Sequence, residues 1–292
     1  MRYAYYPGCS AESTARDMHQ STLAVAAALG IEMVEPKGWT CCGATAGHQT
    51  DRVLAAALPA ANLAKIKDMG LDCVVNCAAC YNRMKVANYE IATESEIRKN
   101  VSDAIGRDYD GSVKIKHFIE VLLNDVGIEK ISRAIKQPLK GLKVACYYGC
   151  LLVRPPKVVN FDDPENPKSL DKLVKAIGGE AIEWPYKVEC CGGGLSLSRT
   201  DVVVNLTDSI IGMAKESGAD CIAVSCPMCQ VNLDLRQQDI KKETGRDYQI
   251  PVVYMTQLLG LGLGISPKKL GFNKLMVPAS KVLDKVEVSS NG

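Results

Sequence analysis

The sequence predicts an α/β protein made of two tandem, pseudo-symmetric units, each with a parallel sheet. Short apolar segments of strand length alternate with longer amphipathic segments, and this alternation runs twice through the 292 residues. One cysteine spacing also recurs in both halves. Because alternating strands and helices favour a parallel sheet with helices on both faces, we expect one unit over residues 1–138. The second should cover residues 139–292 and carry a C-terminal extension.

The first half begins with a strand, a helix and a second strand, expected at residues 3–6, 13–29 and 31–34. Gly30 should end the helix. A longer helix follows, which Thr50 can cap and which should stop at Gly70. Pro59 should kink or break it, because proline has no N–H and clashes with the preceding turn. Residues 71–75 complete the pattern as a third strand.

Ten of the thirteen cysteines form two equivalent sets. The first cysteine set is Cys9, Cys41, Cys42, Cys77 and Cys80. The second cysteine set is Cys150, Cys190, Cys191, Cys226 and Cys229. In both, 34 residues separate the adjacent pair from the CxxC motif. These cysteines follow predicted strands, so we expect each set to gather at the carboxyl edge of its sheet, where α/β proteins bind ligands.

Five thiols are one more than a tetrahedral zinc ion or an ordinary cubane cluster requires. A thiolate can bridge two irons, so five cysteines can hold one iron–sulfur cluster, and we favour that interpretation for both halves. Zinc in one half remains an alternative. The other three cysteines, Cys73, Cys146 and Cys221, fall within predicted strands and are expected in the core.

Composition excludes several other classes of function. The formal net charge of +2 gives no electrostatic reason to expect nucleic acid as a partner. No apolar run reaches the ~20 residues of a membrane span, and the N-terminus lacks the apolar core of a secretory signal. Clustered cysteines in a chain of this size are typical of metal or redox sites in a reducing compartment, so we expect a cytoplasmic protein.

The motifs resemble those of the cysteine-rich CCG domain family. The resemblance rests on Tyr6-Pro-Gly-Cys-Ser10, Trp39-Thr-Cys-Cys-Gly-Ala44, Cys77-Ala-Ala-Cys-Tyr-Asn82, Glu189-Cys-Cys-Gly-Gly193 and Cys226-Pro-Met-Cys-Gln-Val-Asn232. The family includes subunits of heterodisulfide reductases, anaerobic glycerol-3-phosphate dehydrogenase, lactate-utilisation proteins and thiol:fumarate reductase. Within it, the motifs are most similar to the B subunits of the CoB–CoM heterodisulfide reductases of methanogens.

This resemblance implies a non-cubane [4Fe-4S] cluster in each half, held by the matching cysteines. It implies the disulfide CoM-S-S-CoB as substrate, in archaeal methanogenesis with electron bifurcation. It also implies partners, namely a flavin-containing A subunit and an iron–sulfur C subunit, with a hydrogenase as an optional third partner. Two rival functions remain open. One is a related electron-transfer subunit for lactate- or sulfite-linked chemistry, and the other is a non-catalytic partner protein with zinc in one half.

The implied substrate carries sulfonate, phosphate and carboxylate groups, so cations should lie at its binding cleft. The candidate substrate-binding residues are His48, Arg83, Arg154, Lys187 and Arg199, with Arg16 as a further candidate.

Overall fold

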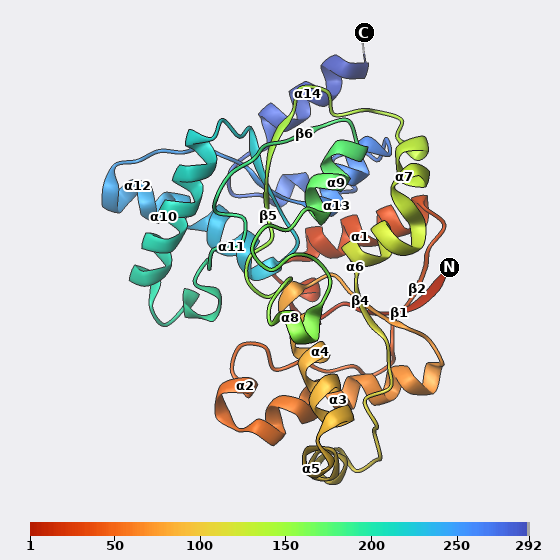
Figure 1. The fold of residues 1–292 in the computed structure, drawn as a ribbon. Coiled ribbons are helices and arrows are strands. Elements are labelled where there is room, and N and C mark those ends of the chain that lie inside the picture. The colour runs from red at the N-terminus through yellow and green to blue at the C-terminus, as the bar shows by residue number, and fades with distance from the viewer. Residues whose placement is uncertain (291–292) are drawn as a thin grey trace.

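The computed structural model describes residues 1–290 and confirms the α/β class, with two four-stranded parallel sheets (Figure 1). The strands of the first sheet are β1 (Arg2–Tyr6), β2 (Glu32–Val34), β3 (Cys73–Val75) and β4 (Ile115–His117). Those of the second are β5 (Lys143–Tyr147), β6 (Glu180–Ala181), β7 (Cys221–Val224) and β8 (Val252–Tyr254). The strand order is β2-β1-β3-β4 in the first and β6-β5-β7-β8 in the second, so the two topologies are the same.

Helices connect the strands in both halves. The first half has α1 (Arg16–Ala28), α2 (Gly47–Thr50), α3 (Arg52–Met69), α4 (Ala78–Thr93), α5 (Ser95–Ile105), α6 (Phe118–Glu120), a π-helical stretch (Val121–Gly127) and α7 (Ile128–Ala134). The second has α8 (Pro156–Val159), α9 (Ser169–Ala176), α10 (Thr200–Glu216), α11 (Pro227–Leu235), α12 (Gln237–Thr244), α13 (Met255–Gly262) and α14 (Ser280–Ser290). The predicted division at residues 138 and 139 falls in the connection between α7 and β5, and it remains a prediction.

The strand register places the two halves in correspondence residue by residue. Tyr5 lies opposite Val74 in the first sheet, and Cys146 lies opposite Ala223 at the matching place in the second. Cys146 therefore occupies the sheet position of Tyr5, as the sequence comparison predicted. Since the strands correspond, the loops that follow them also correspond, and these loops carry the cysteines.

The long helix of the first half differs from the prediction at its N-cap, and of the kink or break expected at Pro59 it shows no break. Asp51, not Thr50, is its N-cap, and the Asp51 side chain accepts a hydrogen bond of 2.8 Å from the N–H of Leu54. α3 also continues through Pro59 to an end at Gly70, which is in the left-handed conformation. Pro59 is buried, so packing outweighs the ~3 kcal/mol that an interior proline costs, and the helix is not broken.

The two halves pack against each other through one helix of each half. α1 of the first half contacts α13 of the second, and the two lie together near the centre of the molecule (Figure 1). A buried hydrogen bond of 2.7 Å joins the hydroxyls of Ser21 and Thr256 across this contact. Within residues 1–290, no helix combines the length and the apolar character that crossing a bilayer requires.

Candidate metal centre and substrate pocket

Each cysteine set comes together from three segments of its half. Cys9 opens a short 3-10 helix after β1, while Cys41 and Cys42 lie in the loop after β2. Cys77 is the N-cap of α4, and Cys80 lies in the first turn of that helix. The second set repeats this placement, with Cys226 as the N-cap of α11. The positive end of a helix dipole favours a thiolate at the N-cap position.

One tyrosine in each half fixes the loop that carries the paired cysteines. The hydroxyl of Tyr6 donates to the carbonyl of Thr40, the residue before Cys41, at 2.6 Å. In the second half, the hydroxyl of Tyr147 donates to the carbonyl of Glu189 at the same distance. Neither tyrosine was predicted as part of the site. Their matching positions in the repeated motif were the signal that could have identified them.

Two glycines give the CxxC thiols room against the backbone. Gly8 and Gly149 both have positive φ, of 78° and 63°. A Cβ at Gly8 would lie 3.1 Å from Sγ of Cys80, and a Cβ at Gly149 would lie 3.1 Å from Sγ of Cys229. A side chain at either position would therefore be strained and would press on the sulfur of a CxxC cysteine.

The glycines after the cysteine pairs have a second role. The N–H of Gly43 donates to Sγ of Cys41, and the N–H of Gly192 donates to Sγ of Cys190, both at 3.4 Å. Backbone N–H donors stabilise thiolate sulfur. Because both glycines have positive φ and lie against a neighbouring helix, the loop turns sharply here and directs the N–H at the thiol.

The thiols within each set contact one another. Sγ of Cys42 lies 3.2 Å from Sγ of Cys80, and the equivalent distance between Cys191 and Cys229 is 3.6 Å. Hydrogen bonds from the thiols of Cys41 and Cys80 lower the pKa of Cys42, and the thiol of Cys229 lowers the pKa of Cys191. The pKa values of Cys190 and Cys226 are lowered as well, each chiefly by a hydrogen bond from another cysteine of the second set. A lowered pKa favours the thiolate, which is the form that binds metals.

The donor set of each half fits an iron–sulfur cluster. Its five thiols come from three segments, and they are one more than a four-coordinate ion requires. A set of this size suits a group of several irons.

The two sets meet at their CxxC motifs. Cys77 and Cys226 are both buried, and each thiol shifts the pKa of the other across the two halves. The neighbouring thiol of Cys226 raises the pKa of Cys77, because it favours the protonated form. The two candidate centres therefore approach each other at the interface of the halves.

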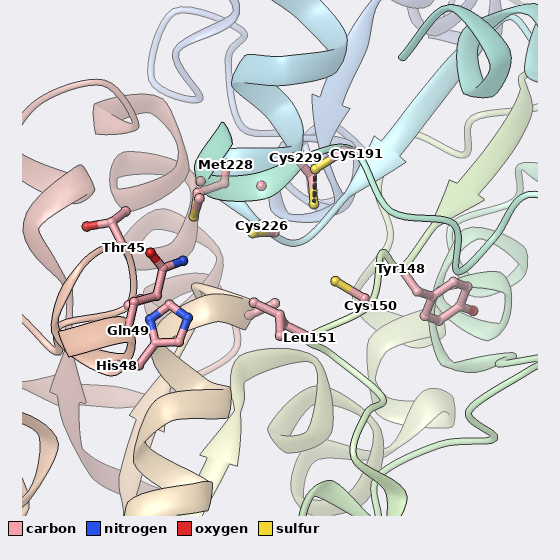
Figure 2. Close-up of a pocket in the computed structure, with 14 residues that line it drawn as sticks. Thr45, His48, Gln49, Tyr148, Cys150, Leu151, Cys191, Cys226, Met228 and Cys229 are labelled. Atoms are coloured by element: carbon pink, nitrogen blue, oxygen red, sulfur yellow. Dashed lines mark hydrogen bonds between the residues drawn. The ribbon is translucent and has the colours of Figure 1, made fainter. Parts of the chain in front are cut away.

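A cavity of about 140 Å³, the thiol pocket, opens beside Cys226. Figure 2 shows Thr45, His48 and Gln49 on one side and the sulfur atoms of the second cysteine set on the other. The second set contributes the residues Cys150, Cys191, Cys226 and Cys229. The first set contributes no thiol to the lining among the described residues, although Ala78 between Cys77 and Cys80 does line it. The second half thus contributes thiols to the wall of this pocket, whereas the first half contributes His48, Gln49, Thr45 and small apolar residues.

Comparison with known proteins identifies the family. The cysteine-rich CCG domain matches residues 3–85 and 144–234, which are the two segments that carry the cysteine sets. The chain belongs to the cysteine-rich CCG domain family. The recurrence of the domain matches the duplicated sheets and the duplicated thiol geometry.

Two relatives cover nearly the whole chain. It is 33% identical over 281 residues to the 8-methylmenaquinol:fumarate reductase membrane anchor subunit of Wolinella succinogenes, covering 96% of this chain and 98% of the relative. It is 31% identical over 297 residues to the B subunit of the ferredoxin/F420H2-dependent CoB-CoM heterodisulfide reductase of Methanosarcina acetivorans, covering 100% and 99%. These family members support an iron–sulfur redox role for this chain.

A solved structure has the same fold. The crystal structure of a hypothetical protein from Helicobacter pylori superposes with a TM-score of 0.74 at 13% identity and covers 94% of this chain. The chain spans about half of that protein, 52% of its length. At this identity, the likeness concerns the fold alone.

The predicted substrate-binding residues lie at different places relative to the two cysteine sets. His48 lines the thiol pocket and is exposed. Arg83 is partly buried and donates to Oδ1 of Asn82 at 2.9 Å. Arg154 forms an ion pair of 2.9 Å with Glu165.

The remaining candidates bind other groups of the protein. The side chain of Lys187 is only 3% exposed and lies 2.7 Å from Oδ1 of Asp171. Arg199 is exposed and binds both carboxylate oxygens of Asp201, two residues further on. Arg16 is exposed and donates to the carbonyl of Glu12. Among the described residues, His48 is the one predicted substrate-binding residue that lines the thiol pocket.

We expect Cys146→Ala to leave the iron content unchanged, because burial in β5 raises the pKa of this thiol and keeps it in the core. Cys42→Ala or Cys191→Ala should instead lose or convert one cluster. The measurement is iron and sulfide per folded chain, with the electronic absorption spectrum. An equal loss of iron from all three variants would show that the ligands are misassigned.

Proposed function

We propose that the chain is the catalytic subunit that reduces the heterodisulfide CoM-S-S-CoB to the thiols of coenzyme M and coenzyme B. The observation that carries this proposal is the meeting of two five-thiol sets at Cys77 and Cys226, beside the thiol pocket. The relatives that are named as B subunits of heterodisulfide reductases support the same substrate.

The reaction consumes one disulfide, two electrons and two protons, and it yields two thiols. Two non-cubane [4Fe-4S] clusters, one held by each cysteine set, would supply one electron each. The chain's own task is to hold its ligands in position, which the tyrosine hydroxyls, the glycine turns and the N–H donors of both halves accomplish. Ligands that are held rigidly by such neighbours are what this kind of site requires.

The pocket lining suits a disulfide. Leu151, Met228 and Ala44 provide apolar surface beside the sulfur atoms of the second set. An apolar wall excludes water from a reacting sulfur and leaves orientation to a few polar groups. His48 and Gln49 are polar side chains of the first half that face the cavity (Figure 2).

The electrons must reach the chain from partners, for which we propose a flavin-containing A subunit and an iron–sulfur C subunit, with a hydrogenase as an optional third partner. Cys9, Cys41 and Cys190 are exposed, which supports electron entry from a docked partner. All thirteen cysteines are free thiols, which suits a cytoplasmic location. The proposal places the chain in archaeal methanogenesis, where bifurcation of electrons would occur on the flavin partner.

A second candidate is an electron-transfer subunit whose substrate is reduced elsewhere. The relative from Wolinella succinogenes, whose name places it in a fumarate reductase, is 33% identical and favours this alternative. In that case the two centres would pass electrons to a partner enzyme, and the disulfide would not be reduced here.

Turnover of CoM-S-S-CoB separates the two candidates. We expect the purified chain, reconstituted with iron and sulfide under anaerobic conditions, to reduce the disulfide with an artificial one-electron reductant. The measurement is the release of both thiols per chain over time. If the artificial reductant reduces the clusters and the disulfide stays intact, the electron-transfer function is favoured.

A further inference from the structure

A second cavity adjoins the thiol pocket. It has a volume of about 360 Å³, and His48 and Gln49 line both cavities. Its remaining wall comes from the start of α3 and from α4, including Arg83. This cavity is the side pocket. The thiol pocket alone is small for an organic ligand, and the side pocket extends it toward the range of ordinary ligand sites.

The two arginines of the side pocket differ in whether they form ion pairs with carboxylates. Arg52 is bound by two carboxylates, Glu90 at 3.2 Å and Glu94 at 2.6 Å. Arg83 is half-buried, and in the described part of the chain it forms no ion pair with a carboxylate. Its guanidinium can therefore accept an anionic ligand, and a partly desolvated arginine binds such groups through charge-assisted hydrogen bonds.

Arg83 is also held in place. Its Nη2 donates to Oδ1 of Asn82, and the amide of Asn82 donates to the carbonyl oxygens of Arg154 at 2.6 Å and Leu151 at 3.2 Å. Asn82 is fully buried, and Leu151 lines the thiol pocket. The cation is thus connected to the wall of the thiol pocket before any ligand arrives, which reduces the entropy lost on binding.

The shared wall of the two cavities fits a ligand that reaches both. His48 and Gln49 line the thiol pocket and the side pocket, and Arg83 lines the side pocket. A ligand with a sulfur in the thiol pocket can therefore extend past His48 and Gln49 and place a charged group at Arg83.

We propose that the side pocket is an anion subsite, in which Arg83 and His48 bind the charged end of a disulfide whose sulfur atoms lie in the thiol pocket. The ligand class is a disulfide with a sulfonate, phosphate or carboxylate end. The inference rests on the proposed function and adds to it that the charged end of the disulfide lies in the side pocket.

The test compares two disulfides of similar length, those of mercaptoethanesulfonate and of mercaptoethanol, which differ in the charge of their ends. Binding to the oxidised, reconstituted chain is measured by calorimetry without a reductant, so that no turnover occurs. We expect the sulfonate disulfide to bind at least about tenfold more tightly, and Arg83→Gln to remove this preference while leaving the neutral disulfide unaffected. Arg83→Lys should restore part of it.

Arg107→Gln is the matched control, because Arg107 is paired with Asp68 and lines neither cavity. This variant should keep the preference. The disulfide of mercaptoacetate replaces sulfonate with carboxylate, and methanesulfonate alone shows how much of the affinity needs the disulfide. All variants are compared at equal iron content and melting temperature.

Two results would overturn the subsite. If Arg83→Gln weakens both disulfides equally, Arg83 acts on the pocket wall through Asn82 and does not bind the anion. If the native chain binds both disulfides equally, no anion subsite exists. Failure of the proposed function has a different signature, since the charged disulfide would then bind with the Arg83-dependent preference and remain unreduced when a reductant is added.

Discussion

Replacing Cys77 or Cys226 with serine should abolish two-electron reduction of CoM-S-S-CoB, even where the cluster of the unchanged half can still be reduced. The two thiols shift each other's pKa across the halves, so each change removes a proposed ligand at the point where the two cysteine sets approach each other. Changing even an outer partner of a metal ligand often costs 10–100-fold in activity, and we expect the loss of a ligand to exceed about 100-fold.

The measurement pairs thiol release with spectroscopic reduction of the surviving cluster. Cys73→Ala and Cys221→Ala are matched controls, because these cysteines are fully buried in the strands that precede the two CxxC motifs. Both controls should keep their turnover, apart from a loss of stability. A substantial turnover in either serine variant would mean that one half only conducts electrons or supports the fold.

The anaerobically reconstituted chain should contain about eight irons and eight inorganic sulfides, since each five-thiol set fits one four-iron cluster. Metal and sulfide analysis of the whole chain gives this ratio directly. Aerobic purification should lower both, because Cys9, Cys41 and Cys190 are exposed and their sulfur atoms would oxidise.

Changing the paired cysteines of one set should halve the iron and sulfide content of the chain. Cys41→Ala combined with Cys42→Ala should leave about four irons, held by the second cysteine set. One zinc per native chain would establish the zinc alternative in one half, and four irons in the native chain would exclude the two-cluster arrangement.

The fold was predictable where the signal is local. Strand and helix periods placed β1, α1 and β3, and the repeated motif aligned Cys146 with Tyr5 before the register confirmed it. The helix across Pro59 was not predictable in this way, because its continuity depends on packing against distant segments.

The sequence predicts which cysteines gather in each half, but it does not predict which residues surround them. Equivalent spacing in the two halves indicated which cysteines belong together, but contacts between the halves have no local pattern. The meeting of Cys77 with Cys226 therefore came only from the structure. Lys187 illustrates the same limit, since its charge is plain in the sequence and its burial against Asp171 is not.

The origin of each cysteine set in three separate segments has a consequence for biosynthesis. The first set spans the chain from Cys9 to Cys80, and its members adjoin only when β1, β2 and the N-terminus of α4 lie side by side. A short zinc finger can bind its metal as soon as its few residues have been synthesised, whereas the first cysteine set is incomplete until Cys80 has been added. We therefore expect the sheet to form before the metal centre is inserted, with the exposed thiols of Cys9 and Cys41 on the accessible side of the site.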